Sequence, residues 1–225
     1  MELKNRYERQ RDIVTKQSLS IGVVGAGAVG RQVCMQLAAM GIEPIYLVDF
    51  DSVDDINLSS QGFRECDVKE TKVSAVVKAC REMNKKLKMR GICKPYSKDL
   101  FKCEVVFNCV DSIETRKQIY VEECLKGSCK LMLDSRMSAE VARVIRCDMT
   151  DTHSKTIYET TFFDASEAYT ERCTSKTTIY CANITAGLMI AELTRWMRGF
   201  YLADECELNI LACSFMVSRP QKKEI

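Results

Sequence analysis

The fold is decided by the stretch Gly25-Ala26-Gly27-Ala28-Val29-Gly30. It follows the apolar run of residues 20–24 and opens a segment with helical spacing of apolar residues, which predicts a strand, a glycine turn and a helix. Gly25 permits the tight turn, Gly27 lets the backbone approach a phosphate, and Gly30 lets the helix lie close to the strand. The N-terminus of that helix directs free N–H groups and the positive end of its dipole at anions.

An acidic residue completes this unit at the end of the next predicted strand. Residues 44–49 are mostly apolar and end at Asp49, 19 positions after Gly30. A carboxylate at that place can accept hydrogen bonds from ribose hydroxyls. The glycines alone are weak evidence, but strand, helix and acid together predict a nucleotide-binding βαβ unit without identifying the nucleotide.

Composition limits the remaining possibilities. The chain has 225 residues, of which 46% are hydrophobic and 28% charged, so it can bury an ordinary core. Its formal net charge of +2 argues against a nucleic-acid-binding surface, although local patches can be hidden in a balanced total. The sequence shows neither an apolar run of about 18 residues nor an apolar secretory segment at its start. We therefore expect a cytoplasmic protein that binds neither nucleic acid nor membrane.

Apolar strands alternate with helices through the first part of the chain, which predicts a doubly wound, mostly parallel, Rossmann-like α/β sheet. After Asp134 the alternation indicates antiparallel strands added on the C-terminal side. We expect a single domain over residues 1–225, with a polar crossing loop at about 150–176. The expected strands are 19–24, 44–49, 91–96, 105–110, 130–134, 140–147, 156–163 and 207–217. The expected helices are 2–15, 29–40, 68–87, 113–126 and a buried 178–198, and residues 51–63 are expected to be irregular.

Polar residues after the predicted strands suggest the chemistry. The carboxyl ends of strands in an open α/β sheet meet at one crevice, so Asp49, Asp51 and Asp111 should share a rim with the glycine loop. Carboxylates bind ribose hydroxyls and Mg²⁺, and Lys72 on the next helix can bind phosphate. These groups suit attack on an α-phosphate. A nicotinamide enzyme would need an acid or base beside the hydride, and the sole histidine, His153, lies in a polar stretch.

The order of these motifs resembles the ubiquitin-activating, ThiF/MoeB/HesA-type adenylyltransferase family. The resemblance covers residues 5–135 well and 136–217 more loosely. It implies a homodimer that uses ATP and Mg²⁺ to adenylate the C-terminal glycine carboxylate of a ubiquitin-like or sulfur-carrier protein. The matching residues are Arg6-Tyr7-Glu8-Arg9-Gln10, the glycine loop, Asp49-Phe50-Asp51-Ser52-Val53, Asn57-Leu58, Lys72 and Asn108-Cys109-Val110-Asp111.

The resemblance also implies roles for single residues. Asp49 corresponds to the ribose-binding acid, Asp111 to the Mg²⁺ ligand, and Arg9 to an arginine that reaches the partner subunit's ATP. Asn57 and Lys72 correspond to triphosphate contacts. The nucleotide-binding set is completed by Asp51, Gln61 and Arg64.

One position departs from the family pattern of Asn-Leu-x-Arg-Gln. This chain has Asn57-Leu58-Ser59-Ser60-Gln61, so Ser60 replaces a phosphate-binding arginine. A hydroxyl cannot substitute for a bidentate guanidinium. Either Arg64 compensates from a different backbone position or the rate is reduced.

Cysteine usage bears on a second reaction step. The thirteen cysteines are odd in number and scattered without C-x-x-C pairs, so we expect most to be reduced, buried thiols and expect no structural zinc. Cys173-Thr174 matches the thioester nucleophile of the ubiquitin-activating branch, and Arg172 and Lys176 would favour its thiolate form. The alternative is a structural thiol.

Alternatives remain for the activity as a whole. They are adenylation in small-molecule or tRNA metabolism, a non-catalytic scaffold subunit of the same fold, and an NAD-dependent dehydrogenase.

Overall fold

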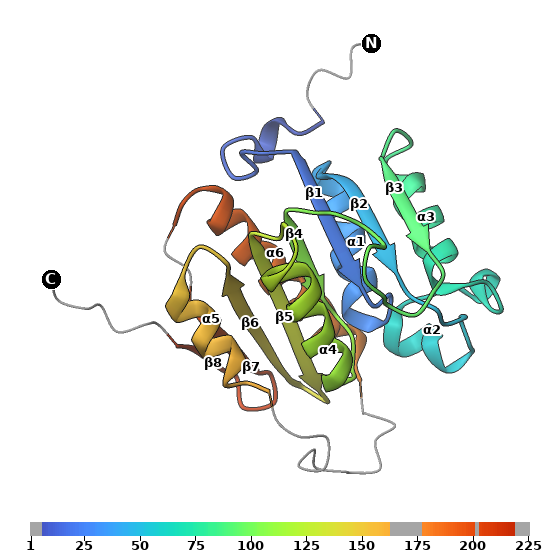
Figure 1. Ribbon diagram of the computed structural model, residues 1–225. Helices are drawn as coiled ribbons and strands as arrows, with labels where there is room; N and C mark the ends of the chain where they lie inside the picture. Colours follow the sequence, from blue (N-terminus) through green and yellow to red (C-terminus); the bar gives the residue numbers. More distant parts are fainter. Residues whose placement is uncertain (1–5, 163–176, 201–202, 219–225) are drawn as a thin grey trace, which may run out of the picture.

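The computed structural model describes residues 6–162, 177–200 and 203–218. Within them the strands form one eight-stranded sheet in the order β3-β2-β1-β4-β5-β6-β7-β8 (Figure 1). The strands are β1 (Ser18–Val24), β2 (Glu43–Val48), β3 (Met89–Ile92), β4 (Val105–Asn108), β5 (Leu131–Ser138), β6 (Val141–Asp148), β7 (Glu205–Asn209) and β8 (Ser214–Ser218).

The direction of the strands confirms the predicted fold class. Strands β1 to β5 pair in parallel, whereas β6, β7 and β8 are added by antiparallel pairing. The chain places β2 and β3 on one side of β1 and then β4 and β5 on the other, so the strand order reverses between β1 and β4. Such a reversal leaves a crevice at the carboxyl ends of the two strands, where doubly wound sheets bind ligands.

Helices cover both faces of the sheet. Helices α1 (Ala28–Met40), α3 (Lys72–Met83) and α6 (Ile179–Met197) contribute to the core on one face. Helices α4 (Ile113–Ile119), extended by a π-helical turn, and α5 (Thr152–Glu159) contribute to the core on the other face, in front of the sheet in Figure 1. Strand residues alternate between the cores: Val23 belongs to the first and Val24 to the second.

Two predictions for the C-terminal half are wrong. Residues 156–159, half of the predicted strand 156–163, lie in α5, because Asp151 caps that helix by accepting the His153 N–H (2.9 Å) and because Ser154 and Tyr158 bury one helical face. Residues 207–217, predicted as one closing strand, belong instead to a hairpin of β7 and β8. Of the expected crossing loop at 150–176, α5 occupies residues 152–159, and residues 163–176 lie outside the described part.

Two N-terminal predictions also differ from the structure. Residues 2–15 are predicted to be helical, but the described part of that segment contains only a 3₁₀ turn at Glu8–Gln10. Residues 51–63 are predicted to be irregular, but they contain the short helix α2 (Ile56–Gln61), which ends at Gly62 with a positive φ of 77°. Among the described residues, every helix is too short or too polar to cross a membrane.

Candidate functional site

The glycine loop lies at the point where the strand order reverses. The Gly25 N–H donates to the Val48 carbonyl at the end of β2 (2.8 Å), and the Cys109 N–H donates to the Val24 carbonyl (2.8 Å). The loops that follow β1, β2 and β4 are therefore tied together at one end of the sheet. Their residues surround the crevice that the strand order predicts.

Close backbone contacts explain two glycines of this loop. Gly25 has a φ of +95°, and a Cβ there would lie 2.6 Å from the Cys109 carbonyl oxygen. A Cβ at Gly30 would lie 1.9 Å from the Gly25 carbonyl oxygen. Gly27 precedes the first residue of α1, so the free N–H groups of the first turn begin at the loop. The loop thus has the geometry of an anion-binding helix N-terminus.

Substitution of Gly30 by alanine should disrupt this loop. The added methyl group meets a backbone carbonyl oxygen and not a flexible side chain, so we expect a loss of about 1–3 kcal/mol in the free energy of unfolding. Nucleotide affinity should fall with it. The matched control is Gly187→Ala within α6, where a Cβ would meet nothing within 4 Å and alanine should stabilise the helix by about 0.5–1 kcal/mol. Urea unfolding of both variants measures the difference, and equal stability of the two would refute the steric argument.

Asp49 holds the glycine loop and the following loop together. One carboxylate oxygen accepts the Ala26 N–H (2.6 Å) and the other accepts the Asp51 N–H (2.8 Å). Burial raises the pKa of the Asp49 carboxyl above its ordinary value, whereas these two backbone hydrogen bonds act in the opposite direction. Each carboxylate oxygen keeps a second lone pair, so Asp49 can still accept a ligand hydroxyl.

Asp51 and Lys72 form an ion pair next to Asp49. The Lys72 ammonium lies 2.7 Å from an Asp51 carboxylate oxygen, and its side chain is 9% exposed whereas that of Asp51 is 47% exposed. Lys72 is the first residue of α3, and its N–H donates to the Asp51 carbonyl (2.9 Å). The structure therefore brings together Asp49, Asp51 and Lys72, as the sequence predicts, and gives the site one nearly buried cation.

Helix α2 contributes residues beside the glycine loop. The Gln61 side-chain oxygen is buried and has no hydrogen-bond partner among residues 6–162, 177–200 and 203–218. Among these residues it is the nearest atom to the Cβ position of Gly27, at 3.9 Å. A buried acceptor without a partner is costly, and a donor from a ligand would satisfy it. The Asn57 side chain accepts the Asp54 N–H (3.0 Å), a bond to the turn that leads into α2.

Ser60, which replaces the family's arginine, and Arg64, which could compensate for it, both make contacts within the protein. The Ser60 hydroxyl donates to the Ile56 carbonyl (3.1 Å). The Arg64 guanidinium donates to Asp67 (3.0 and 3.1 Å) and to Glu82 (3.0 Å), and these hydrogen bonds raise its pKa. The Arg31 guanidinium lies over the Phe63 ring, 5.4 Å from its centroid, and is therefore a second cation near the end of α2. No motif in the sequence points to Arg31.

Asp111 lies in the loop after β4, directly after Cys109 and Val110, whose backbone adjoins Gly25. It is exposed, and within the described part of the chain its carboxylate makes no hydrogen bond or ion pair. The buried Arg116 fixes this loop to the sheet, because it donates hydrogen bonds to the Val110 carbonyl and to Asp134 on β5. No sequence motif predicts the buried pair of Arg116 and Asp134. The only signal in the sequence is the position of Asp134 near the end of a predicted strand.

Arg9 and Cys173 do not join this group of residues in the structure. Arg9 is exposed in the 3₁₀ turn, and neighbouring Gln10 donates to the Met40 carbonyl (2.8 Å), at the end of α1 farthest from the glycine loop. A role for Arg9 at a nucleotide therefore requires a second chain. Cys173 lies outside the described residues.

The other cysteines mostly fit the expected pattern of buried thiols. Within the described residues twelve cysteines are free, and Cys66, Cys93 and Cys213 are the exposed ones. Cys213, expected within a strand, instead lies in the turn before β8. Among these residues no group of three or more His, Cys, Asp or Glu side chains could hold a metal ion.

The fold and this site define a class of doubly wound, nucleotide-binding proteins, and comparison with known proteins identifies the family. The model of the ThiF family matches residues 7–222, so the chain belongs to the ThiF family. This confirms the family that the sequence motifs indicate.

Relatives and solved structures agree with this assignment. Adenylyltransferase and sulfurtransferase MOCS3-1 of Zea mays is 35% identical over 106 residues, 44% of this chain. Ubiquitin-like modifier-activating enzyme 5 of Arabidopsis thaliana is 33% identical over 84 residues, 37% of this chain. The matched part covers 23% of the first relative and 18% of the second. Two structures of E. coli MccB share the fold. The one with SeMet MccA has a TM-score of 0.74 at 14% identity and covers 100% of this chain and 74% of its own. The one with ATP has a TM-score of 0.72 at 15% identity and covers 98% of this chain and 73% of its own.

Proposed function

We propose that this protein uses ATP to adenylate the C-terminal glycine carboxylate of a ubiquitin-like or sulfur-carrier protein. The observation that carries the proposal is the arrangement of Asp49, the Asp51–Lys72 pair and the exposed Asp111 around a glycine loop where the strand order reverses. In the reaction a substrate carboxylate oxygen attacks the α-phosphorus of ATP. The bond to pyrophosphate breaks, and an acyl-adenylate and free pyrophosphate result.

Each residue has a separate task in this proposal. Asp49 accepts hydrogen bonds from the ribose, and the first turn of α1 binds phosphate oxygens. Lys72 exchanges its contact with Asp51 for a phosphate oxygen and neutralises charge on the triphosphate. Asn57 and Gln61 supply further contacts from α2. The buried Gln61 oxygen supports this because no described residue donates a hydrogen bond to it.

Asp111 fits the requirement for magnesium. Mg²⁺ in nucleotide sites is held by one or two carboxylates together with substrate phosphates, not by a cage of protein ligands. A single exposed carboxylate beside a phosphate-binding loop has this character. Bound there with the nucleotide, Mg²⁺ would neutralise phosphate charge during the displacement.

The Ser60 position favours a second candidate, a non-catalytic subunit that pairs with an active one. For Arg64 to contact a phosphate, it must leave both Asp67 and Glu82. Arg31 offers another route to a phosphate contact from α1, next to the end of α2. The two candidates differ in one measurable property, because a scaffold would not exchange pyrophosphate into ATP.

Two measurements on the purified chain test the proposal. Calorimetry should detect binding of Mg²⁺–ATP and no binding of NAD⁺. Pyrophosphate exchange into ATP should then require a small protein that ends in Gly-Gly. Exchange without any protein partner would indicate small-molecule or tRNA adenylation, and no exchange with any of a panel of Gly-Gly-ended proteins would favour the scaffold. Binding of NAD⁺ in place of ATP would overturn the proposal.

A thioester at Cys173 is the proposed second step. The thiolate would attack the acyl-adenylate carbonyl, releasing AMP and forming a thioester with the partner. Cys173→Ala should leave pyrophosphate exchange unchanged and remove every thiol-sensitive adduct on a non-reducing gel. Cys93→Ala and Cys213→Ala, which remove exposed thiols elsewhere, should retain the adduct. An adduct that survives Cys173→Ala would show that another thiol is the acceptor.

A cytoplasmic homodimer with shared sites is also part of the proposal. Because Arg9 lies away from its own glycine loop, Arg9→Ala should lower activity through the partner's site. Mixing Arg9→Ala with Asp111→Ala chains should restore up to about a quarter of wild-type activity by forming one intact site in mixed dimers. A mixture no more active than its components would contradict site sharing, and Arg11→Ala, an exposed neighbour, is the control.

A further inference from the structure

The sheet has an open edge at β3, away from the proposed nucleotide site. In the described part of the chain, β3 pairs with β2 on one side and with no strand on the other. The Lys88 carbonyl accepts the Ile45 N–H (2.9 Å) and the Ile92 carbonyl accepts the Asp49 N–H (3.2 Å), so these carbonyls point toward β2. Because successive residues of a strand direct their backbone groups to opposite sides, Met89 and Gly91 direct theirs outward.

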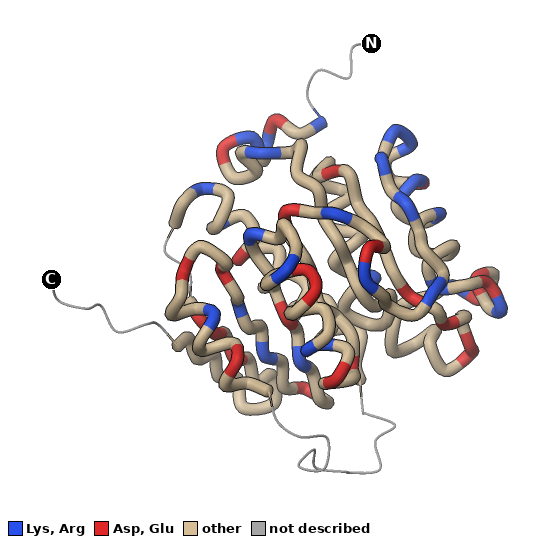
Figure 2. The backbone as a smooth tube through the Cα atoms, in the orientation of Figure 1, with Lys and Arg blue, Asp and Glu red and all other residues tan. Residues whose placement is uncertain are grey.

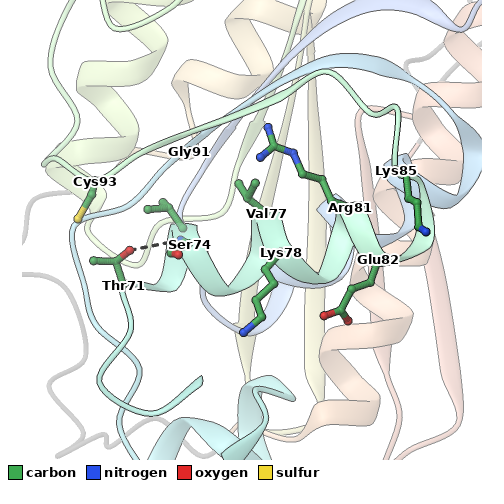
Figure 3. Close-up of a pocket in the computed structure, with 10 residues that line it drawn as sticks. Thr71, Ser74, Val77, Lys78, Arg81, Glu82, Lys85, Gly91 and Cys93 are labelled. Atoms are coloured by element: carbon green, nitrogen blue, oxygen red, sulfur yellow. Dashed lines mark hydrogen bonds between the residues drawn. The ribbon is translucent and has the colours of Figure 1, made fainter. Parts of the chain in front are cut away.

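The outward groups border a groove between β3 and α3, which we call the α3–β3 groove. Its volume is about 740 Å³, and Thr71, Val77, Lys78, Arg81, Lys85 and Gly91 are among its lining residues (Figure 3). Arg81 reaches from α3 to donate to the Met89 carbonyl (2.9 Å), which confirms that this backbone faces outward. Gly91, two residues further, has outward N–H and C=O groups with no partner among the described residues and no side chain to cover them.

This edge carries a strong positive charge. Residues 78–94 contain seven Lys and Arg and one acid, Glu82, which gives a local net charge of +6 in a chain of +2. Figure 2 shows the Lys and Arg positions gathered along α3 and β3. Glu82 is already paired with Arg64 (3.0 Å). Lys85 and Arg90 are exposed and form no ion pair within the described part of the chain.

The charge decides what can pair with the edge. An exposed strand edge is a template for another strand, and basic side chains protect such edges against self-association. A second copy of this edge would bring like charges together and be repelled. An acidic strand would be attracted by the same residues. Nucleic acids and anionic membranes would satisfy the charge but leave the backbone of Gly91 unpaired.

We propose that the α3–β3 groove binds an extended acidic segment of a partner protein by strand addition. The backbone of that segment pairs with Gly91, and its carboxylates lie against Lys78 and Lys85, which line the groove. The surface differs from the nucleotide site, so this binding does not depend on the proposed adenylation.

The test uses a fluorescein-labelled octapeptide of alternating valine and glutamate and measures its anisotropy with the full chain. The peptide should bind, and the same peptide with N-methylated backbone amides should bind at least about tenfold more weakly, because methylation removes the pairing donors but keeps the charge. Equal binding of the two peptides, or no binding of the first, would overturn strand addition.

Charge reversal locates the surface. The double variant Lys78→Glu/Lys85→Glu, in which both positions line the groove, should weaken peptide binding at least about tenfold. The matched control, Lys102→Glu/Lys117→Glu, reverses two exposed lysines outside the groove and should bind like the wild type. Circular dichroism checks the fold of both. A single-stranded oligonucleotide or a phosphatidylserine vesicle that binds in place of the peptide, with the same loss in the groove variant, would reassign the surface to that ligand.

Discussion

Pyrophosphate exchange should fall about a thousandfold when Asp111 is replaced by alanine, with no change in the thermal unfolding midpoint. The carboxylate is exposed and unpaired within the described structure, so its removal costs no packing. In the proposed reaction it holds the cation that neutralises the triphosphate, and loss of one such electrostatic contribution commonly lowers a rate by about 10²–10³-fold. Steady-state exchange measured across Mg²⁺ concentrations reports the effect.

A conservative variant separates metal binding from other effects. Asp111→Asn keeps the shape and a single neutral oxygen, so it should require a higher Mg²⁺ concentration for half-maximal exchange and remain slower than wild type. Asp12→Ala removes another exposed carboxylate, in the N-terminal segment, and should leave exchange unchanged. If Asp111→Ala exchanges pyrophosphate at the wild-type rate, Asp111 is not the metal ligand.

The parts of the fold set by local sequence could be predicted. The glycine spacing and the apolar runs on either side define β1, α1 and β2 within 31 consecutive residues, and their boundaries lie within one residue of the expected ones. The grouping of Asp49, Asp51 and Lys72 then follows from topology, because the carboxyl ends of parallel strands meet. Local motifs and chain order are sufficient for this half of the site.

The missed features depend on side-chain contacts that the sequence patterns do not specify. Residues 156–162 contain the β-branched and aromatic side chains typical of a strand, but Tyr158 and the Asp151 cap make residues 152–159 helical. The partner of Tyr158 is Asp134, 24 positions earlier, and sequence patterns do not reveal such a pair. The same is true of Arg64, because its use by Asp67 and Glu82 removes the cation that the sequence offers in place of the missing arginine.

The free energy of unfolding should fall by about 3–5 kcal/mol when Asp134 is replaced by alanine. Asp134 is fully buried on β5, where its carboxylate accepts hydrogen bonds from Arg116, from Arg136 (3.3 Å) and from the Tyr158 hydroxyl (3.0 Å). Its removal leaves the Arg116 guanidinium, 8% exposed, without its counter-charge under the loop that carries Asp111. Urea unfolding measures the loss.

The cost of leaving the Arg116 charge unpaired can be measured separately from the cost of lost packing. A charge left unpaired in the interior is the costly species, so adding Arg116→Met to Asp134→Ala should recover part of the stability, giving a coupling energy of about 0.5–3 kcal/mol. The surface pair of Lys130 and Glu104 (2.9 Å, side chains 55% and 28% exposed) provides the control, since Lys130→Ala should cost less than about 1 kcal/mol. Additive losses for the two buried substitutions would mean that Arg116 and Asp134 stabilise the fold independently. In that case the hydrogen bond from Arg116 to Val110 would be sufficient to hold the loop after β4, and exchange should survive Asp134→Ala at a temperature where the variant is folded.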